Sequence, residues 1–171
     1  MIHELFVYVD WVKVFRQSTK NKKFFSNKQD ALNKNPDDPE ADLFSILDKL
    51  EDYRSSDGRF QFKLCYPEAT FKSGKSCNEW IQSSNPTQDD VITDFKPVDL
   101  AFTEESYGKP WSGLGRATVG GGALIDDSPK QTHWRSAVGV FNKYYVDRFP
   151  GPLELKLQSW PRLVEMFVKK S

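Results

Sequence analysis

The segment Phe60-Gln61-Phe62-Lys63-Leu64-Cys65-Tyr66 decides the fold, because its large apolar side chains alternate with polar or smaller ones. A period of two is typical of a β-strand that packs one face on a core and turns the other toward solvent. Asp57-Gly58 precedes the segment, and glycine there suits a turn that leads into a strand. We therefore expect a half-buried strand over residues 60–66.

Further segments rich in β-branched and aromatic residues also predict strands. They are Leu5 to Phe15, Val98 to Phe102, Ala137 to Phe141 and Val164 to Lys169. The first follows Glu4 and has no small-residue cleavage site, which favours a strand over a signal peptide. Long stretches punctuated by glycine and proline separate these strands, and long loops in a compact domain are often functional.

One helix is expected, from Asp38 to Arg54. Asp38 suits the N-cap, Pro39 suits the first helical position, and acidic residues suit the positive end of the helix dipole. The apolar residues that follow recur at helical spacing: Leu43, Phe44, Ile46, Leu47, Leu50 and Tyr53. The acidic residues of segment 37–42 also suit a cation, but they lack the EF-hand spacing, and helix capping explains them without a metal.

The composition describes one globular domain spanning residues 1–171. The 171 residues include 13 Phe, 6 Tyr and 5 Trp, enough aromatic surface to bury a core. Lys plus Arg and Asp plus Glu both total 24, which argues against the basic surplus of a nucleic-acid-binding protein. No apolar run approaches the ~20 residues of a membrane span. The predicted fold class is mainly β: a single compact, β-sandwich-like domain with one packed α-helix and long functional loops.

The two cysteines, Cys65 and Cys77, lie twelve positions apart. An even pair in a small chain suits one disulfide, whereas two buried thiols suit a cytosolic protein. Composition favours neither of these alternatives.

Motifs for catalysis are missing. The chain contains no nucleophile elbow, P-loop, His-Glu-x-x-His or Cys-x-x-Cys pattern. The residues left for a hydrolase are Cys65 or Cys77 with His133, as nucleophile and base, or a pair of converging carboxylates. We expect a protein that is not an enzyme.

Two loop-like segments combine aromatic, amide and carboxylate side chains, the combination that sugar recognition needs. One runs from Cys77 to Pro86, and the other runs from Trp111 to Trp134. Galactose offers a C–H face for an aromatic ring and vicinal hydroxyls for amides, carboxylates or a calcium ion. The competing interpretation is that the tryptophans are core residues and that Asp126-Asp127 forms a turn.

Five stretches carry a resemblance to a known family: FSNKQDALNKNPDDPEADLFSILDKLEDYRSSDGRFQFKLCYPE (25–68), CNEWIQSSNP (77–86), YGKPWSGLGR (107–116), LIDDSPKQTHWRSAVG (124–139) and PGP (150–152). The chain resembles secreted domains of sea anemones, corals and other marine invertebrates, and among them calcium-dependent, galactose-specific sea-anemone lectins that form dimers. The resemblance implies an extracellular lectin, a disulfide role for the cysteines and a Ca²⁺ ion that bridges protein and galactose.

Within the matching segments, chemistry selects the candidate ligands. The calcium candidates are the carboxylates Asp126 and Asp127, with Glu79 as a third. The sugar-binding candidates are Trp80, Gln82, Asn85, His133 and Trp134. The expected function is therefore recognition of terminal galactose on glycans by a secreted homodimer, with Cys65 and Cys77 paired either within or between chains. The alternatives are an extracellular matrix or adhesion domain that binds protein partners through its aromatic loops, and a glycan hydrolase.

Overall fold

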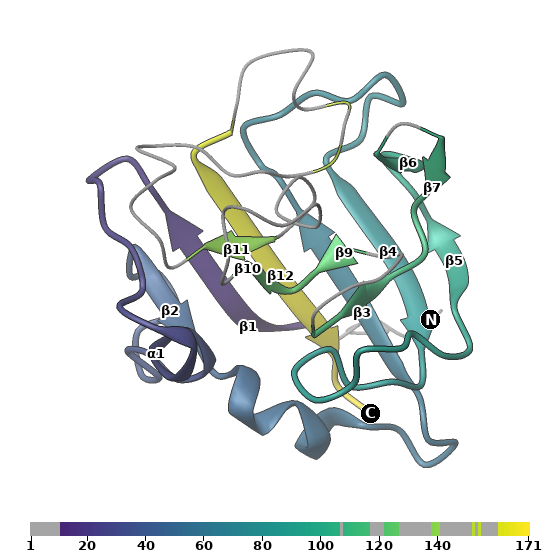
Figure 1. The fold of residues 1–171 in the computed structure, drawn as a ribbon, viewed down its shortest axis with the longest axis horizontal. Helices are drawn as coiled ribbons and strands as arrows, with labels where there is room; N and C mark the ends of the chain where they lie inside the picture. Colours follow the sequence, from purple (N-terminus) through teal and green to yellow (C-terminus); the bar gives the residue numbers. More distant parts are fainter. Residues whose placement is uncertain are drawn as a thin grey trace, which may run out of the picture.

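A six-stranded antiparallel sheet organises the domain (Figure 1). The computed structural model describes residues 11–106, 108–116, 122–126, 138–140, 152, 154 and 161–171. The strands of the sheet, in spatial order, are β2 (Leu43–Ser45), β1 (Trp11–Ser18), β12 (Leu163–Lys169), β3 (Phe60–Cys65), β4 (Cys77–Gln82) and β5 (Lys96–Asp99). The first and last described strands, β1 and β12, are thus neighbours in the interior of the sheet.

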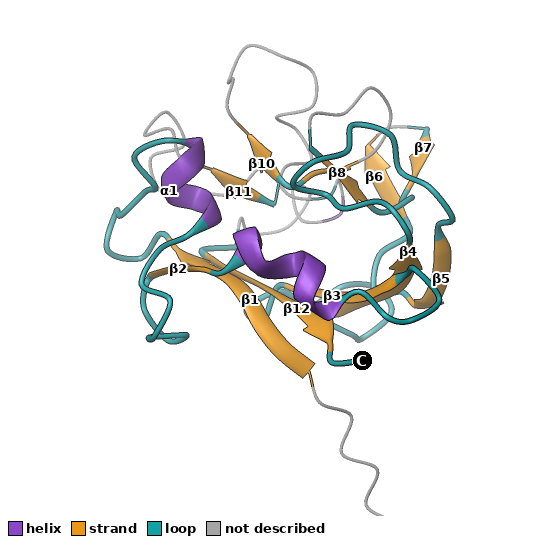
Figure 2. Ribbon diagram, turned by 90° about the horizontal axis from the view of Figure 1, so that it is seen from below, coloured by secondary structure: helices purple, strands orange, loops and turns teal. Residues whose placement is uncertain are grey.

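Short strands form three two-stranded sheets beside the large one. The pairs are β6 (Glu104–Ser106) with β7 (Lys109–Pro110), β8 (Leu114–Gly115) with β9 (Gly122–Ala123), and β10 (Ile125–Asp126) with β11 (Gly139–Val140). Two short helices complete the described elements: α1 (Lys28–Leu32) and the 3-10 helix η1 (Leu47–Tyr53). Figure 2 shows the small sheets gathered on one side of the large sheet. The mainly β prediction is confirmed.

The alternation predicted from the sequence decides which side of the large sheet holds the core. Phe60, Phe62 and Leu64 of β3 are buried, and Phe62 lies opposite the buried Trp80 of β4. β12 contributes Val164, Met166 and Val168 to the same side. We call this side the inner face. On the outer face, the side chains that alternate with them are half-buried, so the sheet has one packed and one accessible face.

The helix predicted from Asp38 to Arg54 is wrong over its first half. Residues 39–42 form turns, Leu43–Ser45 is strand β2, and only Leu47–Tyr53 is helical. Two interactions outweigh local propensity. The backbone of β2 pairs with the open edge of β1, and Arg16 donates hydrogen bonds to the carbonyl oxygens of Glu40 (3.1 Å) and Ala41 (2.8 Å). The α-helix α1 is capped instead by Asn27, whose side chain accepts from Asp30 N.

Two other strand predictions are shifted. β5 spans Lys96–Asp99 rather than residues 98–102, and all four of its residues are exposed because it is an edge strand. β1 continues to Ser18, beyond the predicted end at Phe15. Residues 5–10, 137 and 141 of the predicted strands lie outside the described residues.

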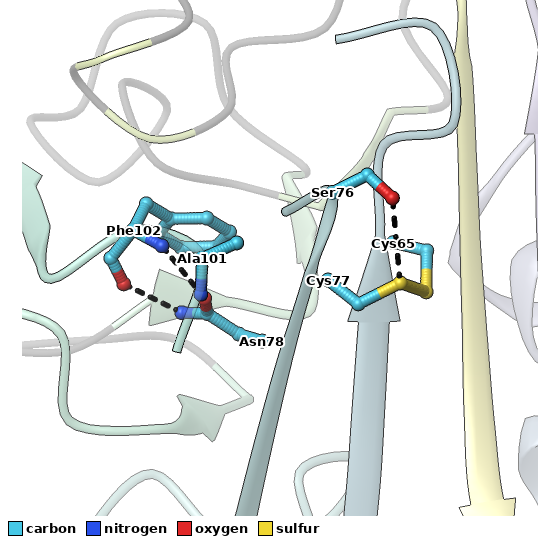
Figure 3. The surroundings of a disulfide bond; sticks show 6 residues. All are labelled: Cys65, Ser76, Cys77, Asn78, Ala101 and Phe102. Carbon is cyan, nitrogen blue, oxygen red and sulfur yellow. Dashed lines mark hydrogen bonds between the residues drawn. A yellow bond between two sulfur atoms is a disulfide. The ribbon is translucent and has the colours of Figure 1, made fainter. Parts of the chain in front are cut away.

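Cys65 and Cys77 form a disulfide within the chain (Figure 3). They lie directly opposite each other on β3 and β4, so the bond ties two neighbouring strands together. The pairing decides between the alternatives left open by composition. Because the chain has only two cysteines, a disulfide between two chains is ruled out.

Leu47 tests whether η1 is structural. Its side chain is fully buried in the core, so Leu47→Ala is expected to lower the free energy of unfolding by ~2–5 kcal/mol, the usual cost of such a cavity. Urea denaturation followed by tryptophan fluorescence measures the change. Lys49→Ala, an exposed position on the same helix, is the control and should change stability by less than about 0.5 kcal/mol. Equal effects of the two substitutions would contradict the packing of η1.

Candidate functional site

Trp80 and Gln82 are core residues of the inner face. Both side chains are fully buried, and the Trp80 indole Nε1 donates to Gln82 Oε1 at 2.7 Å. The rings of Trp111 and Phe62 pack against Trp80 at centroid distances of 5.3 and 5.6 Å. The structure therefore corrects the prediction that Trp80 stacks on a sugar and Gln82 binds its hydroxyls, because neither offers surface to a ligand.

The buried amides of β4 hold the following loops against the sheet. Gln82 accepts from Leu114 N (3.1 Å) and donates to Leu114 O (2.9 Å), so it substitutes for a β-strand partner. Asn78 does the same for the segment after β5: it accepts from Ala101 N and Phe102 N and donates to Phe102 O (Figure 3). These paired hydrogen bonds satisfy backbone groups that burial would otherwise leave unpaired.

Gly113 allows the loop backbone to approach the Gln82 amide closely enough for the hydrogen bonds to Leu114. Its φ of +93° is a conformation that side-chain-bearing residues rarely adopt, and a Cβ here would lie 2.6 Å from Gln82 Oε1. Glycine is therefore required at the point where the loop meets the amide.

Asn85 also has a structural role. Its side chain is buried, donates to Glu51 Oε1 at 2.9 Å and accepts from Thr87 N at 2.9 Å and Thr87 Oγ1 at 2.7 Å. Both ends of the amide are thus occupied within the protein. This corrects the prediction that Asn85 binds a sugar hydroxyl.

The structure separates two of the three calcium candidates. Glu79 lies on the outer face of β4, where its Oε1 accepts from Gln61 Nε2 at 2.6 Å. Asp126 lies in β10, whose Ile125 packs into the core on the inner side. The backbone of β10 and the Glu79 side chain thus lie on opposite sides of the sheet, and the shared calcium site stays a prediction. Asp127, His133 and Trp134 lie outside the described residues.

The acidic residues of segment 37–42 make contacts other than helix capping. Glu40 pairs with Lys13 at 2.5 Å, and this hydrogen-bonded ammonium lowers the pKa of the Glu40 carboxyl. Asp42 accepts from Asn21 at 2.8 Å, which lowers its pKa as well. Within the described part of the chain, no group of three or more His, Cys, Asp or Glu side chains is arranged to hold a metal ion.

A pocket of roughly 240 Å³ opens where the outer face meets the segment after η1. Its floor comes from three neighbouring strands of the sheet: Gln61 of β3, Ile81 of β4 and Lys169 of β12. Gln61 and Ile81 are direct partners in the strand register. The position is thus fixed by the most regular part of the fold.

The wall of the pocket comes from residues 53–59. Tyr53, the last residue of η1, contributes a half-buried ring, while Ser55, Asp57 and Arg59 contribute hydrogen-bonding groups. Asp57 accepts from Arg59 N at 3.1 Å and from the Ser55 hydroxyl, so the turn around Gly58 is held by its own polar side chains. The pocket therefore combines an aromatic ring and an aliphatic side chain with hydrogen-bonding groups.

Arg54 anchors this wall to the sheet. Its guanidinium donates to Gly58 O (2.7 Å) and Ser83 O (2.5 Å) and lies 4.2 Å from the centroid of the Phe60 ring. The Glu51 carboxylate receives two hydrogen bonds from Arg54, both at 2.8 Å, and one from Asn85. These bonds lower the pKa of Glu51 from 4.5 to about 2.

Comparisons of the chain with protein-family models, curated proteins and solved structures return no match. None of the helices in the described residues is long and apolar enough to cross a membrane.

A glutamine-to-leucine substitution on each face of the sheet compares how much the two side chains contribute to stability. Gln82→Leu leaves the Trp80 indole and the Leu114 backbone groups buried and unpaired, so it should cost on the order of 4 kcal/mol of unfolding free energy. Gln61→Leu, on the opposite face of β3, removes one hydrogen bond to Glu79 and should cost about 1 kcal/mol. Urea denaturation compares the two. A Gln82→Leu protein as stable as Gln61→Leu would contradict the structural role of Gln82.

The Glu51 network predicts acid sensitivity. A carboxyl whose pKa is lowered on folding stabilises the native state above its unfolded-state pKa near 4.5, and that contribution is lost as pH falls toward 2. Stability should therefore decrease across this range, and Glu51→Gln should show a shallower decrease than the wild type. Urea denaturation at a series of pH values measures both. Glu68→Gln, which removes a surface carboxylate paired with Lys20, is the control, and a slope equally reduced in both variants would contradict the assignment.

Proposed function

We propose that this protein is a secreted lectin that binds galactose-containing glycans, with one sugar ring in the pocket at Tyr53, Gln61 and Ile81. The observation that carries the proposal is the composition of that pocket. At roughly 240 Å³ it is smaller than the ~300–1,000 Å³ of sites that enclose drug-sized ligands, which suits a single ring. Tyr53 offers an aromatic face for the C–H side of a pyranose, and the polar groups around it suit its hydroxyls.

Galactose selectivity would come from the polar groups at one side of the ring. Gln61 already has its amide nitrogen on Glu79, which leaves its carbonyl oxygen as an acceptor for a sugar hydroxyl. Asp57 and Ser55 line the wall of the same pocket. A site that hydrogen-bonds an axial hydroxyl discriminates against an epimer, since the epimer leaves its polar groups unpaired.

The proposal includes secretion and a homodimer. The Cys65–Cys77 disulfide supports an extracellular location, because such bonds persist in oxidising compartments. Since both cysteines are used within one chain, the proposed dimer is non-covalent. Two linked sites would raise the avidity for multivalent glycans by ~100-fold or more.

The proposal also retains a calcium ion, which the family resemblance implies, with Asp126 and Asp127 as candidate ligands. Asp126 lies on the other side of the sheet from the pocket floor, as Figure 2 illustrates for β10 and the C-terminus. Calcium in that segment would therefore support the fold of the loops, and a ring in the pocket would be held by protein groups alone.

Calorimetric titration with lactose tests the proposal. Tyr53→Ala and Gln61→Leu should each weaken binding by about tenfold or more, since each removes a contact to the ring. Gln29→Leu, on the exposed side of α1, is the matched control and should bind as the wild type does. Unchanged lactose affinity in both pocket variants, with melting temperatures showing that they are folded, would contradict this site.

Titration in calcium and in EDTA, with the melting temperature measured in both, tests the role of the ion. We expect EDTA to lower the melting temperature and to weaken lactose binding only to the extent that the protein unfolds. Asp127→Asn should behave like the wild type in EDTA. Complete loss of lactose binding by a fully folded, calcium-free protein would show that the ion contacts the sugar and would contradict the pocket.

A further inference from the structure

The pocket carries an excess of positive charge. Three of its lining side chains are basic, Arg59, Lys169 and Lys170, and one is a carboxylate, Asp57, which Arg59 approaches to 3.7 Å. Lys169 and Lys170 make no ion pair with any described residue. The chain as a whole has equal numbers of acidic and basic residues, so this excess belongs to the pocket and not to the protein in general.

The positive charge continues from the pocket along the outer face. Lys63 follows Gln61 on the same side of β3, and its ammonium lies 4.2 Å from the centroid of the Trp11 ring. Trp11 in turn is the register partner of Lys169. These three residues therefore form a band on the sheet, half-buried and next to the pocket floor.

Two carboxylates lie near this band, and Glu79 is the register partner of Lys63. Glu79 is hydrogen-bonded by Gln61 at 2.6 Å, and Glu165 is paired with Lys13 at 2.6 Å, while Arg16 approaches the same carboxylate at 3.6 Å. Lys63, like the two lysines of the pocket, makes no ion pair with a described residue. Within the described residues, these three ammonium groups thus have no carboxylate at ion-pair distance.

We propose that the pocket and the band select an anionic glycan, one whose galactose units carry sulfate esters or carboxylates. The inference rests on the proposed lectin function and adds the class of glycan. A lysine ammonium is a compact, strongly hydrated charge on a flexible stem, so it accepts either kind of anion without requiring one fixed geometry. The pocket binds the sugar ring, and Lys169, Lys170 and Lys63 bind the anionic substituents of that ring and of the next one along the chain.

Immobilised polysaccharides of known charge test the class of glycan. The probes are a neutral galactan, the same galactan after sulfation, and polygalacturonate, with binding measured by surface plasmon resonance. We expect the sulfated galactan or polygalacturonate to bind the wild type about tenfold or more tightly than the neutral galactan, and the comparison of the two distinguishes sulfate from carboxylate. That preference should decrease as salt rises, because salt screens exposed charges.

Paired variants locate the preference. The double variant Lys169→Gln, Lys170→Gln should reduce the ratio of anionic to neutral affinity to near one. Lys109→Gln is the matched control: Lys109 is an exposed lysine of β7, makes no ion pair with a described residue and does not line the pocket, so the ratio should stay at the wild-type value. If the double variant does not fold, Lys63→Gln should reduce the ratio on its own.

The outcomes separate the two proposals. Equal binding of neutral and anionic galactans by the wild type, without salt dependence, would overturn this inference and leave the lectin function intact. Absence of binding to lactose and to every galactan would overturn both. Sulfated dextran bound as tightly as sulfated galactan would indicate attraction to any polyanion, and phosphatidylserine vesicles bound through the same lysines would indicate a membrane surface. Either result would contradict selection of an anionic galactose-containing glycan.

Discussion

The opposite orientation of successive side chains along β3 and β4 is the constraint on which the rest of the structure depends. Asn78, Trp80 and Gln82 point to the inner face, so they are buried among the core residues. The residues between them, Glu79 and Ile81, point to the outer face. Aromatic packing and loop attachment therefore use one side of the sheet, and the pocket floor uses the other.

The inner face combines two kinds of interaction. Its aromatic rings form a continuous network that runs from Phe60 through Phe62 and Trp80 to Trp111 and Phe102. The centroids of successive rings are at most 5.6 Å apart. Buried amides beside these rings bind the backbone of segments that contain little regular structure. The hydrophobic contacts supply most of the stabilisation, and the amides specify where each loop lies. Such an arrangement explains why a chain with many long loops can still form a well-packed domain.

Local patterns in the sequence predicted part of this fold. The alternation of residues 60–66 and 164–169 identified β3 and β12, since apolar and polar residues there differ clearly. The helix from Asp38 failed because β1 offers an edge to residues 43–45 that only the folded structure provides. The signals at Asp38 and Pro39 belong to a turn, in which Asp38 Oδ1 accepts from Glu40 N at 3.3 Å.

The candidate site was harder to predict for two reasons. In Cys77–Gln82 both faces contain polar residues, so the pattern does not reveal which amides are buried and does not separate Trp80 and Gln82 from sugar-binding residues. The pocket itself depends on the pairing of β12 with β3, whose residues are about a hundred positions apart in the chain. The solvent-facing positions of these strands, including Gln61 and Lys169, were nevertheless visible in the alternation. The alternation does not show that Gln61 and Lys169 line the same pocket.

The claim that the outer face binds ligand while the inner face is structural can be tested by one measurement: ¹H–¹⁵N NMR spectra of the protein recorded during titration with lactose. The account predicts shifts in the side-chain amide of Gln61 and in the backbone amides of Ile81 and Lys169. The indole N–H of Trp80 and the side-chain amide of Gln82 should stay unchanged, because both are buried and hydrogen-bonded within the core. Shifts at Trp80 and Gln82, with the pocket residues unchanged, would contradict the account.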